Sequence, residues 1–295
     1  MALSLGVIRH GDAWKTCMLE LGRVVEECAF DDAVKTLAYL ERTCAQYPEL
    51  TLAISLACET PFLALSNSTA RQWESLLAFP LNDWTAWQAQ ELLIAVKHIN
   101  LHSYLVPSPR YLPSIPLHRK LSRSYMGSSN DVCIVAALLH RLIEREATWP
   151  EMQLLCIQVN RRFKSIQALG DGYIVNSLAA EIGSMSSDVQ MRAEYERALW
   201  EGLTQDIAGL IAIHHIEDIV ALGDYQDAFI DHFAENYQVY LFPSGETDTP
   251  GFECALGAAL LAEGLYLPGK AGDIVERLSI REAIVLPSNE FTTTT

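Results

Sequence analysis

Positive charge is scarce in this sequence. Its 295 residues include 21 Lys and Arg against 37 Asp and Glu, which gives a formal net charge of −16. Nucleic-acid binding depends on Lys and Arg side chains that displace counterions from the phosphate backbone. The charge balance therefore argues against a nucleic-acid partner, and it favours solubility instead.

Long apolar runs and paired cysteines are also missing. No segment approaches the roughly 18 apolar residues that a membrane-spanning helix needs, and the apolar run before Arg9 and Asp12 is too short for a secretory signal. The seven cysteines include no CxxC pair, which is typical of reduced thiols. We therefore expect a cytoplasmic protein with no membrane partner.

Half of the residues are hydrophobic, so the chain is globular, and its length suits two domains of roughly 150 residues each. Two segments, Leu3–Phe30 and Gln153–Ala180, share one order of strand, polar loop, strand, glycine turn and strand. A shift of 150 positions places Leu5 on Leu155 and Gly22 on Gly172, with Val24 on Ile174 and Val25 on Val175. This recurrence predicts an internal duplication of an α/β unit.

The remaining elements follow from hydrophobic periodicity and proline positions. A proline-rich connector, Val106–Lys120, contains four prolines, which exclude a helix or a central strand there. Helices are expected at 31–47, 71–101, 131–147, 188–213 and 225–237, and the first of them begins with Asp31 or Asp32 as its cap. Strands are expected at 50–58 and 238–242.

The segment Gly251–Leu265, GFECALGAALLAEGL, is the most informative one for function. Its alanines and leucines predict a helix, although Gly257 in the middle lowers helix stability by roughly 1 kcal/mol relative to alanine. With Ala258 and Ala259 beside it, Gly257 leaves one helix face almost bare. A strand, another helix or a flat ligand can approach such a face, and tight helix packing alone is the alternative explanation.

The two meanders and the late glycine–alanine helix resemble the actin, sugar-kinase and Hsp70 ATPase fold. More specifically, the segments 111–138, 154–178 and 255–283 resemble a family of predicted butyrate kinases. The resemblance implies an α/β fold of two similar RNase H-like domains, 1–120 and 121–295, with an interdomain cleft. It also implies ATP and Mg²⁺ as cofactors if the protein is active, and a small-molecule substrate.

In that fold, loops after the first strand of each domain hold the phosphates, and the glycine–alanine helix lies beside the adenosine. The resemblance therefore assigns Asp12 as a catalytic residue, and we add Asp206, which a helix could project toward the cleft as a general base. A solvated helix surface is the alternative for Asp206. The nucleotide-binding residues expected are Gly11, Gly127, Ser128, Arg161, Arg162, Gly223, Gly251 and Gly257.

The chain departs from the kinases of this fold at three acidic positions. Ile8 stands where the first strand usually ends in Asp, so that only a shift of register brings Asp12 into that role. Gln158 and Asn160 occupy the second loop where an acid and a glycine are expected, and Tyr125 replaces the acid of the family's Asp-Met-Gly-Thr segment. Without carboxylates a site cannot organise Mg²⁺ around phosphates in the usual way.

Two hypotheses follow from these agreements and departures. The first is a kinase that transfers the γ-phosphate of ATP to a carboxylate or a hydroxyl. The second is a catalytically inactive relative that keeps the fold to bind a ligand or a protein partner. The altered acidic positions favour the second hypothesis, whereas the glycine–alanine helix and Gly127 leave nucleotide binding open.

Other short patterns carry weaker functional signals. Arg9-His10-Gly11 matches the opening of a histidine phosphatase, but strand-like residues follow where that family has a helix. Arg161-Arg162 suits either an anion clamp or a solvated hairpin tip. Ser244-Gly245-Glu246 suits either a ligand-binding loop or the turn that Pro243 and Gly245 favour.

One cluster has metal-binding residue types, and three tryptophans suggest an interface. His214 and Asp218 are spaced as on one helical face, and His215 and Glu217 lie beside them. A metal site needs a further ligand from elsewhere, and only Asp231 and His232 are near in sequence, so we assign no metal. A surface helix end is the alternative. Trp73, Trp84 and Trp87 are expected to be core residues or anchors of a homodimer contact.

Overall fold

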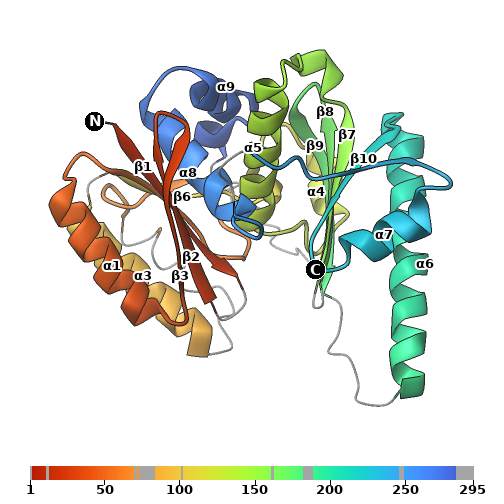
Figure 1. Ribbon diagram of the computed structural model, residues 1–295, viewed down its shortest axis with the longest axis horizontal. Coiled ribbons are helices and arrows are strands. Elements are labelled where there is room, and N and C mark those ends of the chain that lie inside the picture. Colours follow the sequence, from red (N-terminus) through yellow and green to blue (C-terminus); the bar gives the residue numbers. More distant parts are fainter. Residues whose placement is uncertain are drawn as a thin grey trace, which may run out of the picture. The chain divides into compact units, whose positions relative to one another are not determined.

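The computed structural model describes residues 2–10, 13–69, 72, 84–100, 102–160, 163–181, 189–245 and 249–283. These residues form two compact units (Figure 1). Unit 1 comprises Met1–Pro113, Ser128–His140 and Glu246–Thr295, and unit 2 comprises Ser114–Gly127 and Arg141–Gly245.

Unit 1 is built on a six-stranded mixed sheet. Its order is β3-β2-β1-β4-β6-β5, in which β1, β2 and β3 are antiparallel neighbours while β1, β4 and β6 run parallel. Strand β5 pairs antiparallel with β6 at the edge. The strands are β1 Leu3–His10, β2 Ala13–Glu20, β3 Arg23–Phe30, β4 Thr51–Ser55, β5 Leu63–Ala64 and β6 Ser103–Leu105.

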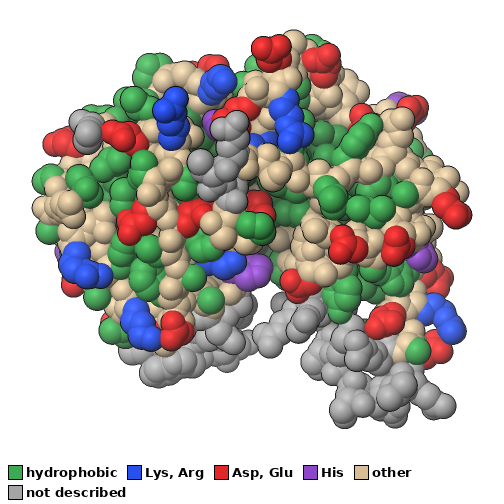
Figure 2. Space-filling view, viewed as in Figure 1, with side chains coloured by type: hydrophobic (Ala, Val, Ile, Leu, Met, Phe, Trp, Pro, Cys, Tyr) green, Lys and Arg blue, Asp and Glu red, His purple; other side chains and the backbone are tan. Residues whose placement is uncertain are grey.

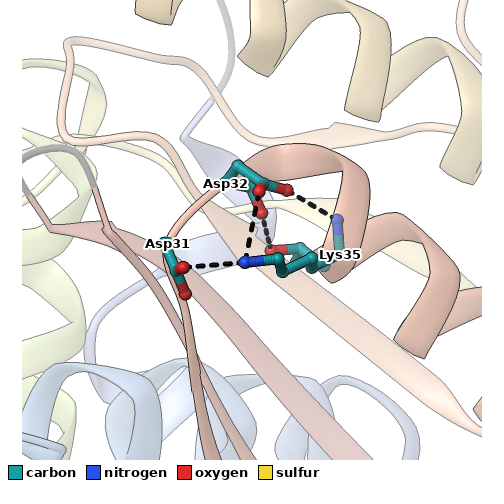
Figure 3. A network of polar contacts seen from close by, with 4 residues as sticks. Asp31, Asp32 and Lys35 are labelled. Carbon is teal, nitrogen blue, oxygen red and sulfur yellow. Dashed lines mark hydrogen bonds and ion pairs between the residues drawn. The ribbon is translucent and has the colours of Figure 1, made fainter.

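Helices α1 (Ala33–Gln46) and α3 (Trp84–Ile99) cover one face of this sheet, side by side (Figure 1). Their buried Leu40 and Leu92 join Leu5 of β1 in one apolar core. The predicted cap of α1 is confirmed, because the Asp32 side chain accepts a hydrogen bond of 2.8 Å from the Lys35 backbone N–H. Figure 3 shows the same lysine side chain reaching Asp31, 2.7 Å away, in an exposed ion pair.

The opposite face of the sheet is covered by α8 (Glu253–Tyr266), which lies on β1, β2 and β4. At Gly6 of β1 an added Cβ would overlap with the backbone of Ala255 and Ala259, so only glycine permits this approach. On its other side Gly257 of α8 meets the backbone of Cys133 in α5 (Ser129–Glu144), and a Cβ there would overlap with the Cys133 carbonyl oxygen. Helix α9 (Lys270–Arg277) follows and packs on α8.

Unit 2 repeats this plan with a five-stranded sheet in the order β11-β10-β7-β8-β9. Strands β7, β8 and β9 are antiparallel neighbours, whereas β7, β10 and β11 run parallel. Helices α6 (Val189–His214) and α7 (Gln226–Phe233) share a core with one face. The strands are β7 Leu154–Val159, β8 Phe163–Gly170, β9 Tyr173–Glu181, β10 Asp218–Leu222 and β11 Gln238–Leu241.

The predicted duplication agrees with the structure at the level of single residues. Leu5 pairs with Met18 in unit 1, and Leu155 pairs with Ala168 in unit 2, so both partners keep the shift of 150 positions. The register shifts fall between Met18 and Leu19 and between Ala168 and Leu169. The glycine turns match as well, with φ values of 50° and 79° at Leu21-Gly22 and of 51° and 79° at Asp171-Gly172.

Three expectations differ from the structure. The chain does not divide at residue 120, because α8 packs on the first sheet and carries the C-terminal segment back into unit 1. The proline-rich connector does hold helix, namely a 3₁₀ turn at Pro109–Tyr111 and α4 (Leu117–Leu121), since Pro116 precedes α4 and breaks none of its hydrogen bonds. Strand β10 was not expected at all.

Charged side chains are spread over the surface. Figure 2 shows acidic side chains across the visible face, with Lys and Arg interspersed among them. None of the helices that the structure describes combines the length and the apolar character needed to cross a membrane.

The glycine contact between α8 and α5 makes a prediction about stability. Gly257→Ala should lower the free energy of unfolding by about 1–3 kcal/mol, because the new Cβ has no space against Cys133. Gly209→Ala in α6 is the matched control, since no described atom outside the local helix backbone lies within 4 Å of its Cβ position. It should raise the free energy of unfolding by about 0.5–1 kcal/mol. Urea denaturation measures both, and equal effects would contradict the packing role of Gly257.

Candidate functional site

The carboxyl ends of parallel strands are where open α/β sheets bind ligands. In unit 2 this edge is formed by β7, β10 and β11. Strand β7 leads through Gln158 to Asn160, and β10 leads to the turn Gly223-Asp224, which precedes α7. These segments are the candidate site of unit 2.

The turn after β10 is held tightly against the end of β7. Gly223 has a φ of +107°, and a Cβ there would lie 2.5 Å from the Val159 carbonyl oxygen and 2.6 Å from Asn160 Oδ1. The Asp224 N–H donates to Asn160 Oδ1 at 3.1 Å, and the Tyr225 N–H donates to the Val159 carbonyl at 3.2 Å. Glycine is therefore required at 223 by both backbone conformation and space.

Two amide side chains at this edge are buried but incompletely satisfied. Asn160 and Gln158 are each 7% exposed, and among the described residues neither Asn160 Nδ2 nor Gln158 Oε1 has a hydrogen-bond partner. Buried polar atoms in folded proteins nearly always have a partner, in the protein or in a bound molecule. The free Nδ2 donor of Asn160 thus suits an acceptor oxygen of water or of a ligand.

The equivalent edge of unit 1 is a fully connected polar cluster. Ser55 Oγ, at the end of β4, lies 2.7 Å from Ser129 Oγ and 2.5 Å from Asn130 Oδ1. Asn130 Nδ2 donates to the Arg9 carbonyl at 2.9 Å, and the Leu56 N–H donates to Ser129 Oγ at 3.2 Å. The first turn of α5 is therefore fixed to the ends of β1 and β4.

The segment before α5 contains two of the predicted nucleotide-binding residues. Gly127 has a φ of +97°, which explains glycine there. Ser128 is used locally, since its N–H and its hydroxyl donate to Asp131 Oδ2 at 2.7 and 3.2 Å. The buried Asp131 carboxylate thus caps α5.

Two thiols near this cluster are poor nucleophiles. Burial raises the pKa of the Cys58 thiol to about 11, and burial with its neighbour Cys133 raises the pKa of Cys254 well above the ordinary value. Both thiols are therefore protonated at neutral pH. Cys254 instead donates to the Asn130 carbonyl, 3.5 Å away.

The other predicted site residues have varied locations. Gly11, Asp12, Arg161 and Arg162 lie outside the described residues, as does Trp73. Gly251 has a φ of +88°, and its carbonyl accepts a 2.6 Å hydrogen bond from Lys15 Nζ.

The remaining two predicted residues have structural partners. Gly257 packs against α5, so its glycine is explained by packing, and a role beside adenosine stays a prediction. Asp206 is ion-paired with Lys164, at a distance of 2.9 Å. A role for Asp206 as a general base stays a prediction as well.

Two of the positions where the sequence lacks an expected acid are equivalent positions of the duplicated units. Ile8 and Gln158 are 150 positions apart, and both lie near the ends of the first strands of their sheets, where they are buried. One side chain is apolar and the other a neutral amide. Neither can ligate a cation with a negative charge.

The histidine cluster does not form on one helix. Helix α6 ends at His214, and Asp218 already belongs to β10, so the two do not share a helical face. The half-buried His214 lies 3.2 Å from Asn176 Nδ2, and burial together with Arg119 lowers its pKa. Among the described residues there is no group of three or more His, Cys, Asp or Glu placed to hold a metal ion.

Sequence reasoning missed Ser55, Asn130 and Asp224. Ser55 ends a buried strand, Asp224 follows one and Asn130 lies in the first turn of a helix, and such positions are a usable signal. For Asp224 the apolar residues 219–222 would have marked the strand.

Comparison with solved structures places the chain in a known fold class. The acetate kinase from Entamoeba histolytica matches with a TM-score of 0.53 at 6% identity, over 79% of this chain and 87% of that one. A ROK family glucokinase from Streptomyces griseus, in complex with glucose and AMPPNP, has a TM-score of 0.49 at 12% identity, over 89% of this chain and 99% of that one. The protein therefore has the actin-like ATPase fold, as the resemblance implied.

Within that class the chain belongs to a defined family. The family described as "Protein of unknown function (DUF1464)" matches residues 20–194, which is more than half of the sequence, and the chain is a member of it. The curated protein sequences give no match.

The polar cluster of unit 1 makes a testable claim about stability. Ser55→Ala should lower the free energy of unfolding by about 1–3 kcal/mol, because it leaves buried partners unsatisfied. Ser108→Ala is the matched control, since the Ser108 hydroxyl is buried and has no hydrogen-bond partner among the described residues. It should change stability by less than about 0.5 kcal/mol, because no side-chain hydrogen bond to a described residue is lost. If chemical denaturation shows that both variants lose the same free energy of unfolding, the polar cluster does not contribute to the stability of unit 1.

Proposed function

We propose that this protein binds a nucleoside phosphate at the carboxyl edge of the unit 2 sheet and transfers phosphoryl groups slowly or not at all. The observation that carries the proposal is the buried Nδ2 of Asn160 beside the Gly223-Asp224 turn, which has no hydrogen-bond partner among the described residues. A buried donor next to a glycine turn suits an anionic oxygen that approaches the backbone closely.

The kinase fold supports a nucleotide as the ligand. Acetate kinase, by its name, is a phosphotransferase, and it shares this fold with the chain. The resemblance to predicted butyrate kinases points the same way, and a small carboxylate or sugar-like acceptor is the corresponding substrate class. ATP with Mg²⁺ would be the phosphoryl donor if the protein is active.

Weak transfer is proposed because of the neutral side chains at the strand ends. Ile8 and Gln158 occupy the equivalent places of the two sheets, and Ser55 and Asn130 fill the unit 1 edge with uncharged groups. Phosphoryl transfer depends mainly on positioning and on metal ions that neutralise charge. Asp224, which is exposed at the end of β10, is the described carboxylate that could recruit Mg²⁺ at the unit 2 edge.

Thermal-shift measurements with ATP test this function. ATP should stabilise the protein in EDTA and in Mg²⁺ alike, by about 2.7 kcal/mol once its concentration is one hundred times the dissociation constant. ADP formation in Mg²⁺ should stay at the background rate. No stabilisation at millimolar ATP would overturn nucleotide binding. Stabilisation that requires Mg²⁺, together with ADP formation, would instead make the protein an active kinase.

A substitution at Asn160 tests the location of the site. Asn160→Asp keeps the Oδ1 acceptor for the Asp224 N–H but replaces the Nδ2 donor by an anionic oxygen. ATP binding in EDTA should weaken by at least about tenfold, since one charged hydrogen bond contributes roughly 1.5–3 kcal/mol. Asn236→Asp makes the same change at an exposed turn of unit 2 and should leave the affinity unaltered. Equal affinities of both variants would exclude Asn160 from the site.

A further inference from the structure

The sheet of unit 2 has two lateral edges, which differ in how the chain treats them. Strand β9 forms one edge, and the chain itself bonds to it: Ser114 Oγ donates to the Ile174 carbonyl at 2.7 Å, and Arg119 Nη1 donates to the Val175 carbonyl at 2.6 Å. Strand β11 forms the other edge, beyond which the described part of the chain adds no strand. This lateral edge is distinct from the carboxyl ends of the strands, where the nucleotide is proposed to bind.

The backbone of β11 presents hydrogen-bonding groups along its lateral edge. The Phe242 N–H, just after the strand, donates to the Ala221 carbonyl of β10 at 3.1 Å. Successive residues of a strand direct their N–H and C=O groups to opposite sides, so Val239 and Leu241 direct theirs away from β10. No described residue outside the sheet bonds to the backbone of either. Two N–H and two C=O groups are thus positioned to pair with a further strand.

The side chains of β11 suit such pairing. Tyr240 and Leu241 are 51% and 49% exposed, although both are large and apolar, and the strand contains no charged residue. Lysine on an edge strand is one of the devices by which proteins block pairing, and β11 lacks it. Pro243 has no N–H to offer, so the pairing surface ends there. The edge therefore has room for one short extended segment.

The surroundings of β11 are strongly acidic. From Ala198 to Gly269 the sequence contains no Lys or Arg, whereas it contains twelve Asp and Glu. Asp227 and Asp231 of α7 and Glu235 in the turn before β11 are all exposed and recur every four residues. Figure 2 shows acidic side chains beside hydrophobic ones in the region where Figure 1 places α7.

This charge distribution decides what kind of segment fits the edge. A second copy of this chain would bring like charges together, because α7, β10 and β11 contain no Lys or Arg. A segment with positive charge at its ends would instead be attracted to the carboxylates of α7 and its turn. Backbone pairing and charge complementarity thus favour a cationic segment from a different protein.

We propose that the lateral edge of β11 binds an extended segment of a protein partner, with apolar residues in its middle and Lys or Arg at its ends. The backbone of the segment pairs with Val239 and Leu241, and its apolar side chains contact Tyr240 and Leu241. Its cationic ends lie near Glu235 and the carboxylates of α7. The edge lies within unit 2 and needs no nucleotide, so that its binding can be tested without ATP.

Fluorescence anisotropy with a labelled peptide and the full chain tests the kind of segment. The blocked peptide Lys-Lys-Thr-Val-Thr-Val-Thr-Lys-Lys should bind saturably, and binding should weaken about tenfold between about 0.02 and 0.2 M salt. Replacement of its lysines by glutamates should weaken binding at least about tenfold. Replacement of its valines by prolines keeps the charge but removes two N–H donors, and should also weaken binding about tenfold.

The peptides separate strand pairing from simple attraction between opposite charges. If the proline peptide binds as tightly as the valine peptide, the edge is not paired and the proposal fails. The proposal fails equally if the glutamate peptide binds as tightly as the lysine peptide, or if the lysine peptide does not bind saturably.

Two substitutions of Leu241 test the location. Leu241→Pro removes an N–H that points away from β10, a place where edge strands tolerate proline, so the ladder to β10 remains. Leu241→Ala is the matched control, because it removes the side chain and keeps the N–H. Leu241→Pro should bind the lysine peptide about fivefold more weakly than Leu241→Ala, since one hydrogen bond is lost. Equal affinities of the two variants would exclude the β11 backbone from the interface.

A charge reversal tests the acidic surroundings, and sedimentation equilibrium tests the alternative occupant. Glu235→Lys should weaken peptide binding about three- to tenfold at low salt, whereas Glu41→Lys, on the exposed surface of α1, should leave it unchanged. The parent protein should sediment without self-association through β11. A dimer that Leu241→Pro dissociates would instead make a second copy the occupant. Circular dichroism of each variant establishes that it is folded.

Discussion

The close approach of α8 to β1 and α5 is the constraint on which unit 1 depends. Gly6 on the sheet and Gly257 on the helix both remove a side chain where backbone meets backbone. Such contacts tolerate no added methylene, because folded interiors are packed at crystal density. The contact between Gly6 and α8 also joins segments that are far apart in sequence, so one face of the first sheet is covered only when the C-terminal segment has returned to it.

The duplicated plan gives the two sheet edges different characters. In unit 1, Ser55, Ser129 and Asn130 satisfy one another and fix the start of α5. In unit 2, Gln158 Oε1 and Asn160 Nδ2 at the equivalent edge have no hydrogen-bond partner in the part of the chain that the structure describes. A satisfied polar cluster stabilises a structure, whereas an unsatisfied one leaves donors and acceptors available to water or to a ligand. Function is therefore proposed for the second edge, although the strands of both follow the same order.

Local patterns in the sequence predicted the two meanders and the main helices but not the partners of their side chains. The alternation of side chains and the glycine turns predicted both meanders, and the composition of Gly251–Leu265 predicted a helix. The partner of Gly257, however, is Cys133, and the partner of Asp206 is Lys164, and neither pairing has a local signal. The domain boundary failed for the same reason. Strand β10 was missed because it is only five residues long, too short for an alternating pattern to stand out.

The matched turns and register shifts also bear on how the chain folds. Each meander pairs residues that are neighbours in sequence, such as His10 with Ala13 and Gly170 with Tyr173. Local pairings have a low entropic cost and form quickly, whereas parallel strands must wait for a long crossover to close. We therefore expect the two meanders to form early in folding, one in each unit. Unit 2 is built from a nearly continuous segment, whereas the sheet of unit 1 is covered by α8, which lies far along the chain from its strands.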